Sequence, residues 1–377
     1  MPTYPTYKLG DVAEIINGKN QKEVVSSQGD YPIYGSGGII GWATDYLCKE
    51  NSTIIGRKGT IDSPIFVNRK FWNVDTAFGI QPSERVLPRY LFFFCKSFDF
   101  KKLDKSTTIP SLAKRDLLQI SIPLPPLPTQ QAIVTRIESL FAELDKAAEH
   151  LRTAQQQLKT YRQAVLNHWL NNEDGKWEMV KLGEVAEKIF DGPFGTHLKS
   201  DDYVSSGIRV VRLENIKAGY FDDSKQSYVT PEKYEIIKRH TVYPTDLIMS
   251  TFISEEVKVC QMPKHIEFAV NKADCIGIRL KPLANNDFIK YYLSLRSVYH
   301  QLEIQVHGAT RPRVNTTQIK NIEINLPPLT DQHRIVQEIE SRLSQAEAAE
   351  ASIAEALQKT EALRQSILKK AFSGELV

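Results

Sequence analysis

The arrangement of apolar residues predicts two long helices, residues 129–170 and 330–372, and neither stretch contains glycine or proline. In each, apolar or small residues recur with an alternating spacing of four and three, which is typical of a coiled-coil seam. Such a helix spans roughly 60 Å at about 1.5 Å per residue. The first seam contains Ile133, Ile137, Leu140, Leu144, Ala147, Leu151, Ala154, Leu158, Tyr161 and Val165. The second contains Ile335, Ile339, Arg342, Ala346, Ala349, Ile353, Ala356, Thr360, Leu363 and Ile367.

The seams contain one charged residue, and further apolar residues lie beside them on the two helices. Arg342 is the charged residue of the second seam, and we expect Leu343 beside it to fill the gap. Seven further apolar residues lie off the seams, where they either pack on the attached domains or form a surface for another protein. These residues are Val134, Phe141, Leu166, Trp169, Val336, Leu343 and Leu368.

The two helices belong to a longer internal repeat. The segment KLGDVAE (Lys8–Glu14) returns as KLGEVAE (Lys181–Glu187), an offset of 173 residues. The segment TIPSLAKRDLLQISIPLPPL from Thr108 parallels TRPRVNTTQIKNIEINLPPL from Thr310, and this offset of 202 continues through both helices. The second copy therefore carries 29 additional residues in its middle. Similar ends with different centres predict two domains of one architecture that present different surfaces.

Both domains are predicted to be α/β (α+β), with short strands and one strongly apolar helix each. The segment KLGDVAEII (Lys8–Ile16) is expected to form a short amphipathic helix. Apolar helices are expected at Arg89–Leu103 and Phe288–Leu302. Strands are expected at Thr53–Gly59, Ser63–Asn68, Thr76–Gln81, Gly207–Ile216, Asp246–Phe252 and Cys275–Lys281.

The order of the parts predicts their arrangement. The domains occupy residues 1–128 and 173–329, and the helices, with their ends, occupy residues 129–172 and 330–377. If the two helices form one antiparallel pair, the domains lie at opposite ends of it. The halves are then related by a pseudo-two-fold axis, and the chain termini lie close together.

Composition limits the class of protein. Hydrophobic residues make up 41% and charged residues 25%, as in globular proteins. No apolar run reaches membrane length and no signal peptide opens the chain, so we expect a cytoplasmic protein. The four cysteines lie far apart without a CxxC pair and are expected to be unpaired buried thiols. A net charge of +3 allows a nucleic-acid partner without requiring one.

The chain lacks the familiar signatures of catalysis. It has no Walker loop, no HExxH, no GxSxG, no zinc-binding spacing, and no Asp/Asn-Pro-Pro-Tyr/Phe motif for adenine methylation. We therefore predict no catalytic and no metal-binding residue. This pattern favours a binding role, although an enzyme with an unfamiliar site stays open.

Polar and basic loops are the candidates for DNA contacts. The loop YGSGGIIGW (Tyr34–Trp42) either lets the backbone approach a phosphate or forms an ordinary hairpin turn. Cationic side chains between glycines, at strand ends or in matched loops can contact phosphates or guanine edges, but any single one is more often a solvated surface charge. The candidate residues are Arg57, Lys58, Lys105, Thr107, Thr108, Thr196, His197, Lys199, Arg209, Arg212, Arg311 and Arg313.

The whole chain resembles the specificity (S) subunit of bacterial type I restriction–modification systems. The resemblance rests on the paired KLG(D/E)VAE openings, the Pro-Pro-Leu boundaries, the two long helices and the ending RQSILKKAFSGELV. The segments YPIYGSGGIIGWATDY, IIGRKGTIDSPIFVN and FWNVDTAFGI are similar to one type of target-recognition domain. The segment DGPFGTHLKSDDYVSSGIRVVRLENI is similar to another.

The resemblance implies a function and partners. Each target-recognition domain would read one half of a bipartite, asymmetric site in double-stranded DNA, and the helix pair would set the gap between the halves. The helices would also dock two methylation (M) subunits, which bind S-adenosylmethionine, whereas this chain would hold no cofactor. Restriction (R) subunits would complete the complex. A structural coiled-coil adaptor that binds proteins and a standalone nuclease or methyltransferase are the alternative hypotheses.

Overall fold

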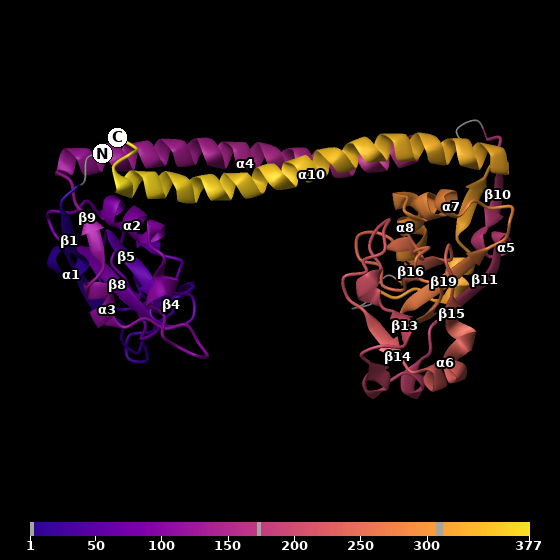
Figure 1. Ribbon diagram of the computed structural model, residues 1–377, viewed down its shortest axis with the longest axis horizontal. Coiled ribbons are helices and arrows are strands. Elements are labelled where there is room, and N and C mark those ends of the chain that lie inside the picture. Colours follow the sequence, from indigo (N-terminus) through magenta and orange to yellow (C-terminus); the bar gives the residue numbers. More distant parts are fainter. Residues whose placement is uncertain (1–3, 172–174, 307–311) are drawn as a thin grey trace. The chain divides into compact units, whose positions relative to one another are not determined.

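The computed structural model describes residues 4–171, 175–306 and 312–377, which form two compact units (Figure 1). The first unit contains Met1–Thr153 with Ile353–Val377, and the second contains Ala154–Ser352. Each unit therefore holds one domain together with part of both long helices. No helix in the described ranges is long and apolar enough to cross a membrane.

Both domains begin and end with the same elements. A short strand, one helical turn and a second strand open each domain, and the first strand pairs antiparallel with the strand before the long helix. In the first domain these elements are β1 (Thr6–Lys8), α1 (Leu9–Val12), β2 (Ala13–Asn17), α3 (Lys114–Leu118) and β9 (Ser121–Pro123). Their counterparts are β10 (Glu178–Lys181), α5 (Leu182–Val185), β11 (Ala186–Asp191), α9 (Thr316–Lys320) and β20 (Glu323–Leu326).

A four-stranded antiparallel sheet is also common to both domains. Its strand order is β2-β8-β5-β6 in the first domain and β11-β19-β16-β17 in the second. The buried side chains of this sheet share a core with the helix that follows β8 or β19. The elements are β5 (Ser52–Gly56), β6 (Ile65–Val67), β8 (Ala77–Pro82), α2 (Pro88–Ser97), β16 (Leu247–Ser250), β17 (Val259–Gln261), β19 (Cys275–Leu280) and α7 (Asn286–Leu293).

The second sheet differs between the domains, which confirms that the repeat diverges at its centre. It has three strands, β4-β3-β7, in the first domain and five, β12-β14-β13-β18-β15, in the second. One parallel pair is retained, β3 with β7 and β13 with β18. The strands are β3 (Tyr31–Gly35), β4 (Gly38–Ala43), β7 (Trp72–Asn73), β12 (Tyr203–Val204), β13 (Ile208–Val211), β14 (Ser227–Val229), β15 (Thr241–Val242) and β18 (Ala269–Asn271).

Short helices complete the second domain and one part of the first. The α-helices are α6 (Pro231–Ile237) and α8 (Arg296–Glu303). The 3-10 turns are η1 (Phe100–Leu103), η2 (Gly195–His197), η3 (Ser200–Asp202), η4 (Leu213–Asn215), η5 (Lys238–His240) and η6 (Ile304–Val306). Helix α6 and turn η5 lie between β14 and β15, in the enlarged centre of the second domain.

Three helix predictions are corrected by the structure. Only Leu9–Val12 of the segment Lys8–Ile16 is helical, because the alternating burial from Ala13 onward fits strand β2. The predicted helix Arg89–Leu103 ends at Ser97, and Asp99 then caps turn η1 by accepting a hydrogen bond from the Lys101 N–H. The predicted helix Phe288–Leu302 is interrupted at Leu295, whose backbone is extended, and continues as α8.

The strand predictions fall on real strands, and most extend beyond the observed ends, whereas Thr76–Gln81 is displaced by one residue from β8. The segment predicted as Gly207–Ile216, for example, contains β13 followed by turn η4. The loop Tyr34–Trp42 is a β-hairpin, in which β3 pairs antiparallel with β4, so the hairpin interpretation is confirmed. Tertiary strand pairing sets these boundaries, and local propensity does not.

The long helices are α4 (Leu127–Leu170) and α10 (Leu329–Ser373). In the first unit, Ile133 and Ile137 of α4 share the domain core with Leu368 and Ala371 of α10. Asp145, further along α4, hydrogen-bonds to Arg364, which lies earlier in α10. The two segments therefore run antiparallel within this unit.

The second unit shows the same pairing. Arg162 of α4 forms an ion pair with Glu350 of α10, with an Nη2–Oε2 distance of 2.9 Å. Val165 and Leu166, later in α4, share a core with Ile335 and Ile339, earlier in α10. The antiparallel prediction is thus confirmed within each unit, and Phe372 contacts Tyr90 of the first domain at a ring distance of 5.1 Å.

Most residues of the predicted seam are buried or half-buried, with local shifts. Ala147 is exposed and Ala148 is buried in its place, while Tyr161 and Leu363 are exposed. Arg342, which was assigned to the seam, is exposed, and the neighbouring Leu343 is buried and fills the gap as predicted. The apolar residues off the seam pack on the domain cores, which confirms the packing interpretation for Val134, Phe141, Leu166, Trp169, Val336, Leu343 and Leu368.

Candidate nucleic-acid interface

Three loops that the sequence singled out meet at one end of the first domain. Arg57 and Lys58 directly follow β5, and their N–H groups donate to the Thr76 carbonyl at 2.8 and 3.2 Å. The Gly59 N–H donates to the Pro110 carbonyl at 2.9 Å, which joins this loop to the polar segment that contains Lys105, Thr107 and Thr108. The fold thus brings all five predicted first-domain residues into neighbouring loops.

The glycine-rich hairpin between β3 and β4 lies against the same loop. A side chain at Gly56 would place its Cβ 1.8 Å from the Thr60 carbonyl oxygen and 3.1 Å from the Ser36 Cβ, so the turn after β5 requires glycine. Ser36 lies at the hairpin turn. The hairpin therefore lies beside the loop that contains Arg57 and Lys58, as do the segments that contain Thr76 and Pro110. The surface at this end therefore combines cationic and polar side chains with the exposed apolar side chains of Ile39, Ile40 and Ile109.

The candidate side chains of the first domain differ in their partners. Arg57 is half-buried and donates from Nη1 to the Asp75 carbonyl at 3.3 Å, whereas Lys58 is exposed. Lys105 hydrogen-bonds to Asp116 at 3.0 Å, and this bond holds the pKa of that carboxyl below its usual range. Thr107 and Thr108 are both exposed.

The corresponding loops also meet in the second domain. The Val314 N–H donates to the Thr251 carbonyl at 2.9 Å, and Phe252 and Arg313 form a backbone bridge. The Arg313 guanidinium pairs with both carboxylate oxygens of Asp274, at 3.2 and 3.3 Å, and lies 4.4 Å from the centre of the Phe252 ring. Arg311, also predicted from the sequence, lies outside the described residues.

This domain has a second cationic cluster, formed by Arg212, which the sequence predicted, and Lys272, which it did not. Arg212 follows β13 and Lys272 follows β18, and these two strands run parallel. Parallel strands end at the same edge of a sheet, so both side chains reach the Tyr203 ring, with cation–ring distances of 5.4 and 5.2 Å. Sequence reasoning missed Lys272 because β18 was not predicted as a strand.

Arg209 lies in the same strand, β13, but its side chain is buried. Its side chain is 7% exposed, and its Nη2 donates to Asp223 at 2.6 Å and to the Lys225 carbonyl at 3.0 Å. These bonds hold β13 to the segment that follows Asp222. The burial gives Arg209 a structural role, so we do not include it in the proposed DNA surface.

The remaining candidates lie on the loop after β11. His197 and Lys199 are exposed, beside turns η2 and η3. The Lys199 N–H donates to the Asp202 carboxylate at 2.6 Å, which shapes the loop and leaves the Lys199 side chain outward. The side chain of Thr196 lies outside what the structure describes.

The described part of the chain contains possible metal ligands and cysteine thiols. Its His, Cys, Asp and Glu residues form no group of three or more that could hold a metal ion. Cys48, Cys95, Cys260 and Cys275 are free and buried, as predicted. Burial raises the pKa of Cys48 and Cys95 to about 12, which keeps these thiols protonated near neutral pH.

Comparisons with known proteins agree with this picture. The family model for the type I restriction modification DNA specificity domain matches residues 1–151 and 174–358. The chain is 26% identical to the EcoKI specificity subunit of Escherichia coli K12 over 313 residues, 79% of this chain and 67% of that protein. It is 21% identical to the Escherichia coli EcoDI specificity subunit over 417 residues, 99% of this chain and 88% of that protein.

Solved structures share the fold. A chain from a structure of the type I R-M system superposes with a TM-score of 0.76 at 18% identity, covering 100% of this chain and 99% of that one. The HsdS subunit from Thermoanaerobacter tengcongensis gives a TM-score of 0.54 at 19% identity and covers 100% and 98%.

These matches do not favour the adaptor hypothesis, because neither the family model nor the relatives describe a protein-binding scaffold. The repeated elements, the two long helices and the family match over most of the chain lead to one assignment. The chain belongs to the family of type I restriction–modification DNA specificity proteins.

Proposed function

We propose that this chain is the DNA-reading subunit of a type I restriction–modification complex, in which each domain reads one half of a bipartite, asymmetric site. The observation that carries the proposal is a common framework with different loops. At matched places, where the loop after β5 or β16 meets the segment before α3 or α9, the first domain presents Arg57, Lys58 and Ser111, whereas the second presents Thr251, Phe252 and Arg313. Different side chains on one framework suit two different half-sites.

The proposed recognition surface of each domain combines cations with polar groups. In the first domain it contains Arg57, Lys58, Lys105, Thr107 and Thr108. In the second it contains Thr196, His197, Lys199, Arg212, Lys272, Arg311 and Arg313. Cationic side chains supply phosphate contacts that position the duplex, and arginine or threonine side chains at the loop tips read base edges. Lys272 joins the surface because it shares the Tyr203 ring with Arg212.

We assign methylation and cleavage to partner subunits. The sequence contains no motif for transfer of a methyl group to adenine, which supports this assignment. The M subunits would bind S-adenosylmethionine, and this chain would bring them to the right sequence. In a restricting complex, R subunits would add the cleavage function.

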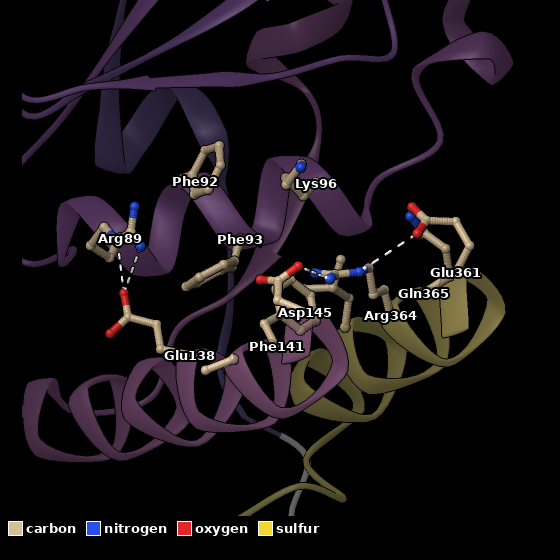
Figure 2. A pocket seen from close by; sticks show the side chains of 12 residues that line it. Arg89, Phe92, Phe93, Lys96, Glu138, Phe141, Asp145, Glu361, Arg364 and Gln365 are labelled. Carbon is tan, nitrogen blue, oxygen red and sulfur yellow. Dashed lines mark hydrogen bonds and ion pairs between the residues drawn. The ribbon is translucent and has the colours of Figure 1, made fainter. Parts of the chain in front are cut away.

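The helix pair would set the gap between the half-sites and dock the M subunits. A helix of 44 residues, the length of α4, spans roughly 66 Å at about 1.5 Å per residue. Protein domains that read one face of a duplex lie about one helical turn apart, roughly 34–36 Å, or a multiple of it. A surface pocket of about 560 Å³ between α2, α4 and α10, lined by aromatic and charged side chains, is one place on the first unit where such a partner could dock (Figure 2).

A map of modified adenines tests the proposal. We would sequence DNA from cells that express the chain with the neighbouring methylation subunit, and from cells in which this chain is deleted. A single bipartite motif with a constant gap that disappears on deletion is the expected result. A continuous motif, or one that survives the deletion, would show that this chain does not supply the specificity.

A further inference from the structure

We infer that Gln130 and Gln332 are positioning residues for DNA recognition, because each holds its domain at a set angle on the long helix that begins beside it. The inference rests on the proposed function, in which the gap depends on where each domain points. Both side chains are fully buried, at 0% exposure. They occupy equivalent places in the repeat, 202 residues apart.

The Gln130 side chain bonds to two separate segments of the first domain. Its Nε2 donates to the Arg85 carbonyl and to the Pro125 carbonyl, both at 2.9 Å. Its Oε1 accepts from the Leu87 N–H at 2.9 Å. Both amide hydrogens and the amide oxygen are therefore used, and one side chain joins the segment before α2 to the turn before α4.

Gln332 makes the same three contacts in the second domain. Its Nε2 donates to the Leu283 carbonyl at 3.2 Å and to the Pro327 carbonyl at 2.8 Å. Its Oε1 accepts from the Asn285 N–H at 2.7 Å. The Pro-Pro-Leu boundary is identical in the two domains, whereas the segments that the glutamine reaches, Arg85–Leu87 and Leu283–Asn285, differ in sequence. The same three bonds therefore form although one partner segment has changed.

The chemistry of the junction explains why a glutamine is needed. The N–H groups of Thr129 and Gln130 bond to the Pro126 carbonyl, which leaves the carbonyl of the buried Pro125 outside the helix ladder. A buried carbonyl without a donor is unfavourable, and the glutamine amide supplies one. The same amide reaches the Arg85–Leu87 segment, so it ties the covalent junction to a second point on the domain.

Other contacts at the junction also hold the domain on the helices. Phe93 of α2 meets Phe141 of α4 edge to face at 5.8 Å, and Arg89 pairs with Glu138 at 2.7 Å (Figure 2). An aromatic pair tolerates a range of ring positions, and the ion pair is partly open to water because Arg89 and Glu138 are each 43% exposed. The hydrogen bonds of the buried glutamine are directional and shielded from water, so they resist a change of angle.

The test compares methylation of DNA duplexes whose gap has the mapped length with duplexes whose gap is one base pair longer or shorter. The variants are Gln130→Met and Gln332→Met, assembled with the methylation subunit, because methionine has a similar volume and no amide. The matched controls are Ile133→Val and Ile335→Val, which lose packing at the same helix starts but keep the glutamine bonds.

We expect the preference for the mapped gap to fall about tenfold in each glutamine variant, with both half-sequences unchanged; tenfold corresponds to about 1.4 kcal/mol. The isoleucine controls should lose thermal stability and keep the gap preference. An unchanged preference in the glutamine variants, an equal loss in the controls, or failure of both glutamine variants to assemble would overturn the positioning role. A wild-type complex with no bipartite site would instead refute the proposed function.

Discussion

Replacing Asn73 by alanine should destabilise the first domain and weaken its reading of one half-site. Asn73 ends β7 and is fully buried. Its Nδ2 donates to the Ala77 carbonyl at 3.0 Å and to the Ile16 carbonyl at 3.4 Å. The turn that it closes contains Thr76, whose carbonyl accepts the N–H groups of the candidate loop at Arg57. The side chain therefore links the sheet to the proposed DNA surface.

The magnitude follows from the hydrogen bonds that the alanine removes. A typical intramolecular hydrogen bond contributes about 1 kcal/mol net, and the 3.4 Å bond contributes less. The alanine also leaves a small buried cavity, which adds about 1 kcal/mol. The expected loss of unfolding free energy is thus about 2–3 kcal/mol. In a unit of this size each kcal/mol corresponds to a fall in Tm of about 2–4 °C, so Tm should fall by about 4–12 °C.

Calorimetry of the purified chain measures this effect, with the exposed Asn68→Ala as the matched control. The control should leave Tm within about 1 °C, as expected for an exposed side chain. Methylation of duplexes with altered half-sites should show relaxed reading of the first-domain half. A Tm loss no larger than that of the control would refute the view that Asn73 holds this turn. Asn271, which donates to the Cys275 carbonyl at the equivalent turn, should show the same behaviour for the other half.

Three further changes test the helix pair, the independence of the domains and the cationic cluster. Adding one heptad to each long helix should lengthen the gap by about three base pairs, since seven residues add about 10 Å; a methylome with altered half-sequences would contradict this. Exchanging residues 17–103 for those of another family member should change one half-site alone, and a change in both would show that the domains do not read independently. Replacing Arg212 and Lys272 by glutamine should reduce the slope of log affinity against log salt by about 0.9 for each phosphate that is no longer neutralised. The exposed Lys369→Gln should leave that slope unchanged, and an unaltered slope in the double variant would remove this cluster from the DNA surface.

The sequence alone was sufficient for the features that depend on local periodicity. The four-three spacing predicted both long helices within two residues of their observed starts at Leu127 and Leu329 and ends at Leu170 and Ser373. The repeated openings and Pro-Pro-Leu boundaries predicted two copies of one framework. A helix is specified by neighbours three and four residues away, and an internal repeat is visible as identity, so neither needs knowledge of distant contacts.

The candidate surface depended on the tertiary structure. Lys272 meets Arg212 only because β13 and β18 run parallel, and these strands are far apart in the sequence. Arg209 resembled a DNA contact in the sequence, yet its pairing with Asp223 buries it. Gln130 looked like an ordinary helix residue, and only the fold places the Arg85 carbonyl beside it. In each case the physical reason is the same: burial and hydrogen-bond partners come from chain segments that the local pattern does not specify.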